Sequence, residues 1–193
     1  MKGKWNWFQK VGFLLIAVSF LWLLGSELLA RNNQVAAQRI AGQILEVIPK
    51  SGEGFPEGYS NPAMPVLQME GTDFSAIVRV PAFGITLPVA DDWAGGSISA
   101  YPRRFWGSAY DDSLILGGSS RQGQFAFCGQ MDLGDAIVVT DMTGTEFSYE
   151  VAGIDRCKKA DMEILAEDGY GLTLFTRESA TGKYIVVRCV FSP

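Results

Sequence analysis

Short runs of β-forming residues, separated by turn residues, occupy the chain from about residue 67 onward, and this pattern constrains the fold most strongly. Each run is too short for a typical helix and is rich in Val, Ile, Phe or Thr. Closely spaced short strands are typical of a β-barrel or a β-sandwich. The strand candidates are residues 74–80, 83–89, 113–117, 136–140, 146–151, 172–177 and 183–188. Residues 101–106 lack the pattern, and we expect an irregular or helical stretch there.

The two strand candidates nearest the end of the chain, 172–177 and 183–188, flank a short polar turn. Two β-rich runs around such a turn predict a β-hairpin. We expect this hairpin to place Arg177 and Tyr184 at one rim of the fold. Alternating apolar and polar residues predict a second hairpin over residues 136–151.

The segment 11–30 is almost wholly apolar. As an α-helix it would be about 30 Å long, which matches the hydrocarbon core of a bilayer. Segment 1–10, before the apolar run, contains three lysines and is expected to lie in the cytoplasm. The sequence therefore predicts a single-pass anchor with an extracellular C-terminal domain. The alternative is a cleaved signal peptide, although the passable cleavage sequence at 35–37 lies well beyond the apolar run.

The region between the apolar run and the strands, residues 31–66, is expected to be a helical stalk and a linker. Apolar residues recur at helical spacing as far as Val47, and Pro49 ends the pattern. Residues 51–65 are rich in Pro and Gly and predict an exposed linker. The folded domain is expected to span residues 67–193.

Charge and composition exclude several function classes. The net charge of the chain is −5, and the three lysines before residue 11 leave −8 for the remainder. An acidic body argues against nucleic acid as a partner. The chain has no histidine, which excludes Ser-His-Asp and Cys-His catalysis and histidine-based metal sites. We therefore expect no cofactor and no bound metal.

The three cysteines, Cys128, Cys157 and Cys189, show no C-x-x-C spacing, so a metal cluster or a thioredoxin-type motif is not expected. One disulfide and one free thiol remain open in an oxidising compartment. Cys189 lies in an apolar strand candidate and is interpreted as an inert core residue.

Seven segments, taken in order, resemble the sortase family, and its class B-like members most. The matching segments are 80–89, Trp93, 102–108, 114–118, 133–144, 172–176 and 187–189. Sortases are membrane-anchored cysteine transpeptidases of Gram-positive surfaces. The resemblance implies a mainly β fold, a sortase-like closed eight-stranded β-barrel with short helices, here preceded by one N-terminal transmembrane helix.

The resemblance also locates three catalytic positions, and all three are substituted. The family's histidine position is Ser119, aligned on Gly118, and its nucleophilic cysteine position is Arg177, aligned on 172–176. Its arginine position is Tyr184. A guanidinium stays protonated and offers no lone pair, so no thioacyl intermediate can form at Arg177.

Two relocated catalytic arrangements remain as alternatives. Ser119 with Lys183 is a conceivable Ser-Lys dyad, with Ser120 as a second rim hydroxyl, and Cys128 is another conceivable nucleophile. The simpler interpretation makes the rim residues exposed polar groups and Cys128 structural. We thus assign no catalytic residue, and take Ser119, Ser120, Arg177, Lys183 and Tyr184 as binding candidates.

The sequence therefore predicts a membrane-anchored, extracytoplasmic pseudoenzyme, which binds an extended peptide, a cell-wall peptide or a sorting-signal protein. The first alternative is a cell-surface transpeptidase or hydrolase with relocated residues. The second is a structural partner in surface-protein or pilus assembly.

Overall fold

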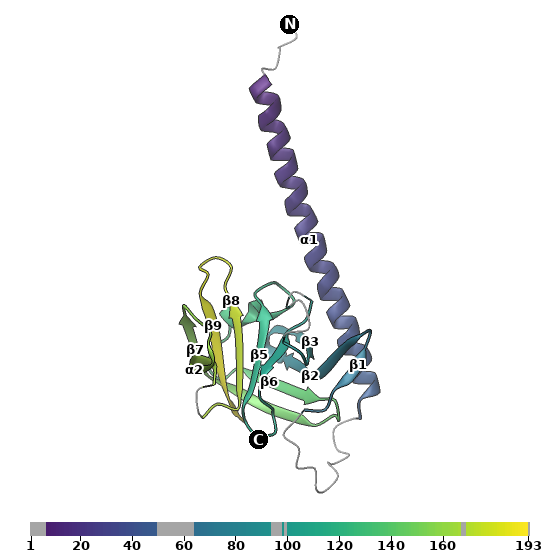
Figure 1. Ribbon diagram of the computed structural model, residues 1–193, viewed down its shortest axis with the longest axis vertical. Helices are drawn as coiled ribbons and strands as arrows, with labels where there is room; N and C mark the ends of the chain where they lie inside the picture. The colour runs from purple at the N-terminus through teal and green to yellow at the C-terminus, as the bar shows by residue number, and fades with distance from the viewer. Residues whose placement is uncertain (1–6, 50–63, 94–97, 99, 167–168, 193) are drawn as a thin grey trace.

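The computed structural model describes residues 7–49, 64–93, 98, 100–166 and 169–192. The expected linker 51–65 therefore lies almost wholly outside the described residues, as do residues 1–6. The described chain is a β-barrel with one long N-terminal helix, α1 (Trp7–Val47) (Figure 1). The other helices are short: α2 (Met162–Leu165) and two 3-10 turns, η1 (Pro81–Phe83) and η2 (Phe125–Gly129).

In the described part of the chain, nine strands form one sheet, in the order β1-β2-β3-β4-β5-β8-β9-β7-β6. A further pairing of β2 with β6 closes the sheet, so the eight strands from β2 to β9 form the barrel and β1 lies outside it on an edge of β2. The predicted closed eight-stranded barrel is confirmed. The strands are β1 (Leu67–Met69), β2 (Thr72–Val80), β3 (Ile85–Ala90), β4 (Arg103–Trp106), β5 (Leu114–Ser119), β6 (Ala136–Asp141), β7 (Glu146–Cys157), β8 (Leu172–Arg177) and β9 (Tyr184–Phe191).

Both predicted hairpins are present. In the first, β6 pairs antiparallel with β7. Its turn is held by the buried Asp141 carboxylate, which accepts hydrogen bonds from the backbone N–H groups of Thr143 and Thr145 at 2.8 and 2.9 Å. Gly144 in this turn has a φ of +85°, a conformation that favours glycine. In the second hairpin, β8 pairs antiparallel with β9.

The segment 101–106, expected to be irregular or helical, instead contains strand β4, so that expectation was wrong. β4 pairs in parallel with β3 through one residue pair and antiparallel with β5, with a register shift between Arg104 and Trp106. The β propensity of this segment did not predict a strand, because it contains two adjacent arginines and follows Pro102. Arg103 is buried and Arg104 is partly buried, and both side chains form hydrogen bonds to the loop after β3.

The last turns of α1 pack against the barrel and are more than a free stalk. Ile40 and Ile44 are fully buried, in a cluster with Phe74 and Ile77 of β2 and Ala90 of β3. Residues spaced by four lie on one helix face, so a single stripe of α1 makes this contact. The barrel therefore has a helix attached to its wall.

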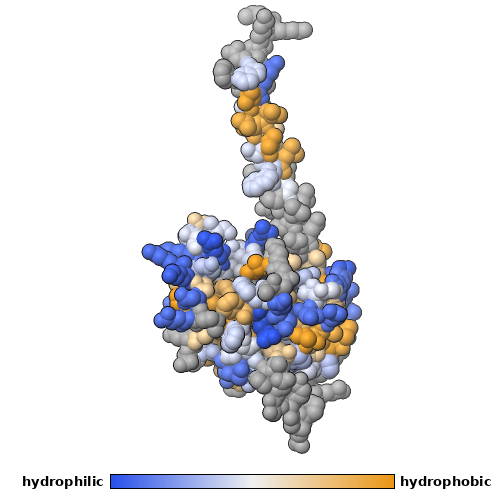
Figure 2. Space-filling view, viewed as in Figure 1, coloured by the Kyte–Doolittle hydropathy of each residue, from blue (hydrophilic) through white to orange (hydrophobic). Residues whose placement is uncertain are grey.

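The opposite part of α1 extends away from the barrel (Figure 1). Large apolar side chains there are exposed, among them Phe13, Leu15 and Trp22, at 60%, 62% and 75%. Figure 2 shows apolar surface gathered along this part of the helix. Within the described residues, no helix combines the length and apolar character that crossing a membrane requires.

Candidate functional site

Ser119, Arg177 and Tyr184 occupy neighbouring positions at the ends of three adjacent strands. Ser119 at the end of β5 pairs with Arg177 at the end of β8 in the parallel register. Arg177 pairs in turn with Tyr184 at the start of β9. The structure thus brings together the three positions that the sequence had aligned with family catalytic residues, and we call these residues the rim row.

A cavity of about 470 Å³ opens beside the rim row. All three rim-row residues line it, together with Ser120, Arg121 and Ser179. Its apolar side includes three aromatic side chains, Trp93, Phe105 and Phe175. We call this space the rim cavity; its size is in the usual range for small-ligand sites.

Gly117 in β5 makes room for the aromatic side of the cavity. A Cβ on Gly117 would lie 2.4 Å from the Trp93 ring and 2.6 Å from the Phe175 ring. Trp93 in turn contacts Phe105 edge-on at 4.9 Å and Phe175 at 5.5 Å between ring centroids. The Leu-Gly-Gly segment therefore permits a close aromatic cluster that no side chain at 117 would allow.

The hairpin turn beside the rim cavity is internally bonded. Gly182 N–H donates to the Glu178 carbonyl at 2.9 Å, and Arg177 Nε donates to the Gly182 carbonyl at 3.3 Å. The hydroxyls of Ser120 and Ser179 lie 3.1 Å apart and link the segment after β5 to this turn. The two segments that carry Arg121 and Arg177 are therefore connected at the opening.

The rim cavity is basic. Arg121 and Arg177 are exposed side chains, and no carboxylate is present among the described residues that line the cavity. Neither arginine forms a salt bridge with any residue that the structure describes. In an acidic chain, two such guanidiniums at one opening favour an anionic ligand.

The remaining sequence candidates are placed less favourably. Lys183 is exposed and is not among the described residues that line the rim cavity. Cys128, in η2, is fully buried in the barrel core, and burial strongly raises the pKa of its thiol. Cys189 is also fully buried, and burial raises its pKa to about 12. Both thiols are neutral near pH 7, which makes them poor nucleophiles.

Sequence reasoning missed four contributors to the site. Cys157, at the end of β7, pairs with Tyr184 and extends the rim row by one strand; its Sγ lies 4.0 Å from the Tyr184 carbonyl oxygen. Arg121, Trp93 and Phe105 come from loops and from β4. No local signal assigns Arg121, Trp93 and Phe105 to a shared cavity, because only the barrel's parallel β5–β8 pairing and its loops bring them there.

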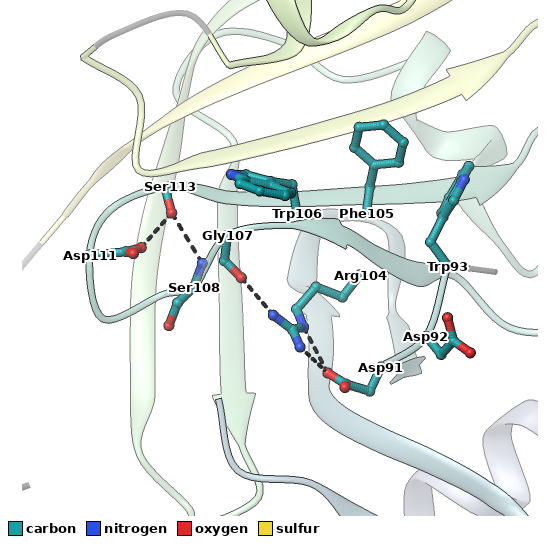
Figure 3. Close-up of a pocket in the computed structure, with 10 residues that line it drawn as sticks. All are labelled: Asp91, Asp92, Trp93, Arg104, Phe105, Trp106, Gly107, Ser108, Asp111 and Ser113. Carbon is teal, nitrogen blue, oxygen red and sulfur yellow. Dashed lines mark hydrogen bonds and ion pairs between the residues drawn. The ribbon is translucent and has the colours of Figure 1, made fainter. Parts of the chain in front are cut away.

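A second cavity, of about 650 Å³, adjoins the first and shares Trp93 and Phe105 with it. Its lining includes Asp91, Asp92 and Asp111, with Arg104 as the cation. Figure 3 shows Arg104 joined to Asp91 and to the Gly107 carbonyl below a row of aromatic rings. We call this space the acidic cavity.

The described residues of the acidic cavity are engaged with one another. Arg104 neutralises Asp91 at 2.6 Å, and Asp111 accepts a hydrogen bond from Ser113. In the described part of the chain, no three Cys, Asp or Glu side chains are close enough together to hold a metal ion.

Solved structures of sortases share this fold. Sortase C1 from Streptococcus agalactiae matches 65% of this chain and 71% of its own, with a TM-score of 0.55 and 21% identity. Sortase A from Corynebacterium diphtheriae matches 85% of this chain and 84% of its own, with a TM-score of 0.53 and 17% identity. The sortase D5 transpeptidase of Clostridium perfringens matches 81% of this chain and 89% of its own, with a TM-score of 0.52 and 15% identity.

No protein-family model matches the chain, and no curated protein matches it either. The sortases named above are of classes A, C and D, so the closer likeness to class B-like members stays a prediction. Identities at this level carry the fold but not the activity. With its closed eight-stranded barrel, this chain has the sortase fold.

Proposed function

We propose that this protein is a non-catalytic binding module built on the sortase fold, anchored in the membrane by its N-terminal helix. Its ligand is an extended peptide, in the form of a sorting signal or a cell-wall peptide. The observation that carries the proposal is the place of Arg177 in the rim row. The sequence resemblance aligns this position with the family's nucleophilic cysteine.

The chemistry of the rim row supports binding over bond-making. Acyl transfer requires a nucleophile and a group that protonates the leaving amine. Arg177 lacks a lone pair to attack a carbonyl, and the chain has no histidine to move a proton. Among the described residues that line the cavity, the basic side chains near Ser119 are the guanidiniums of Arg121 and Arg177, which do not deprotonate near neutral pH.

The shape of the rim cavity supports a peptide ligand. Its aromatic side suits an apolar side chain, and its hydroxyls and guanidiniums suit carbonyl and carboxylate oxygens. Ser119, Ser120 and Tyr184 offer hydroxyl groups that donate or accept hydrogen bonds. An extended chain with alternating side chains presents both kinds of group at short intervals.

The anchor is proposed from the apolar run 11–30 and its flanking lysines. The exposed apolar side chains of α1, such as Phe13 and Leu15, support it, because such surface is costly in water. In this arrangement the barrel lies outside the cell and is attached to its anchor by the packed turns around Ile40 and Ile44.

Calorimetric titration of the full chain in detergent micelles with sorting-signal and cell-wall stem peptides tests the binding role. We expect saturable binding that Trp93→Ala weakens. Trp106→Ala is the matched control, because Trp106 is exposed but is not among the residues that line the rim cavity. The proposal fails if none of these peptides binds, or if both variants bind as the unchanged protein does.

The anchor is tested separately. Membranes from expressing cells are washed with carbonate at high pH, and intact cells are treated with protease. We expect the chain to stay with the membranes and the barrel to be cut from outside. Release by carbonate, or full protection of the barrel, contradicts the proposed anchor or its orientation.

A further inference from the structure

The rim cavity differs from its surroundings in charge. The guanidinium groups that line it, those of Arg121 and Arg177, have no carboxylate partner in the described part of the chain. The described salt bridges pair Arg39, Arg79, Arg104 and Arg188 with carboxylates. Two exposed guanidiniums that have no acidic partner among the described residues, at one opening of a chain with net charge −5, favour an anionic ligand.

The hairpin turn orients one of these guanidiniums. Arg177 uses Nε to donate to the Gly182 carbonyl at 3.3 Å, which leaves the donors on its two Nη atoms for a ligand. A guanidinium held in this way loses less side-chain freedom when it binds a planar carboxylate in a two-pronged geometry. The 3.1 Å contact between the Ser120 and Ser179 hydroxyls joins this turn to the segment that carries Arg121.

The aromatic side of the cavity sets what accompanies the anion. The Phe105 and Phe175 rings are 5.3 Å apart, and Trp93 packs against both. An apolar side chain placed on this cluster would be removed from water, and the burial of its apolar surface would contribute favourably to the free energy of binding. A carboxylate directly bonded to the same residue would then lie near the cavity's cationic rim.

The acidic cavity on the other side of Trp93 and Phe105 opposes the same anion. Among its described lining residues it carries three carboxylates and one guanidinium, whereas the rim cavity carries two guanidiniums and no carboxylate. An anionic group is therefore favoured on one side of Trp93 and repelled on the other. This contrast favours the negatively charged end of a peptide in the rim cavity.

We infer that the rim cavity binds the free C-terminal carboxylate of a peptide whose last residue is apolar, with Arg177 and Arg121 as the carboxylate's partners. This inference rests on the proposed binding function and specifies its ligand as a chain end. An internal stretch of peptide does not carry a carboxylate on the backbone, so the two kinds of ligand are distinguishable.

The test uses full-length protein in detergent micelles and three synthetic peptides. The first is N-acetyl-glycyl-glycyl-alanyl-leucine with a free C-terminus, and the second is its C-terminal amide. The third is N-acetyl-glycyl-glutamyl-alanyl-leucine amide, which carries its only carboxylate on a side chain. We expect the free acid to bind at least about tenfold more tightly than either amide, as for a charge-assisted hydrogen bond.

Variants assign the effect to the cavity. We expect Arg177→Gln to remove the preference for the free acid, Arg177→Lys to retain part of it, and Arg121→Gln to reduce it. Lys183→Gln is the matched control, because it removes one positive charge next to Tyr184 from a side chain outside the described cavity lining. Thermal unfolding of each variant shows whether it is folded. If Arg177→Gln does not fold, the binding of Arg121→Gln tests the inference in its place.

Each outcome decides the inference. Equal binding of the free acid and its amide overturns it and leaves the proposed peptide binding standing. Equal losses in Lys183→Gln and Arg177→Gln also overturn it, because the effect would then be general charge attraction. Tight binding of the glutamyl amide indicates a side-chain carboxylate ligand and overturns the C-terminal assignment. Absence of binding by all three peptides overturns it too, while the sorting-signal and stem peptides still test the proposed function.

Discussion

Replacing Ile44 by Ala tests whether α1 is part of the folded barrel domain. The Ile44 side chain is fully buried between the helix and the barrel, in contact with a cluster that includes Phe74 and Ile77. Truncating a buried Ile to Ala typically costs about 2–5 kcal/mol, because transfer free energy is lost and a cavity remains. The better helix propensity of Ala returns only a few tenths of a kcal/mol.

The magnitude follows from the size of the chain. For a domain of roughly 150–250 residues, each kcal/mol lowers the Tm by about 2–4 °C, so a loss of about 3 kcal/mol lowers it by about 6–12 °C. The assay is thermal unfolding of the full chain in detergent, followed by circular dichroism at a wavelength where the β-sheet contributes.

The matched control is Val47→Ala, on the same helix and 64% exposed. We expect it to change stability by no more than about 0.5 kcal/mol. If Ile44→Ala melts at the same temperature as Val47→Ala, the helix is not packed on the barrel and the reasoning is refuted.

Three further predictions concern the barrel core and the cavity floor. Thr176 has a buried hydroxyl without a described partner, so Thr176→Val should raise the free energy of unfolding by about 1 kcal/mol, measured by urea denaturation; a loss would mean that the hydroxyl is bonded. Gly118→Ala should destabilise by about 1–3 kcal/mol, because its Cβ would lie 2.4 Å from the Phe125 ring; an unchanged urea midpoint contradicts this. Burial raises the pKa of Cys189 from 9.0 to about 12, so its contribution to stability is complete below pH 9 and declines as pH rises toward 12. Cys189→Ala should reduce this alkaline loss relative to the unchanged protein, and equal pH profiles would argue against it.

Strand candidates were predictable where apolar and polar residues alternate over several positions. The hairpin of β6 and β7 is such a case, because in β7 Tyr149 and Val151 are buried in the main core while Glu146 and Glu150 are exposed. β4 was missed, since Arg103 and Arg104 owe their strand geometry to pairing with β5 and have little β propensity of their own.

The helix illustrates a different limit. Ile40 and Ile44 follow a helical spacing that predicted an apolar face, and the structure confirms the helix. The spacing does not name the partner of that face. The partner, around Phe74 and Ala90, belongs to strands separated from the helix by the linker, so only the folded barrel identifies it.

The candidate site was predictable only in part. Alignment on Gly118 and on residues 172–176 placed Ser119 and Arg177 together, and the strand register brings them side by side. Arg121 and Trp93 were missed, because they lie in loops whose positions depend on distant strands.

The central claim is that the rim row binds a peptide without cutting or acylating it. Equilibrium dialysis of the full chain against a sorting-signal or stem peptide that binds it, followed by intact mass spectrometry of both molecules, tests this directly. We predict that peptide accumulates on the protein side, that it keeps its full mass, and that the mass of the protein is unchanged. A shortened peptide, or an acyl adduct on Ser119, Cys128 or Cys157, would contradict the account.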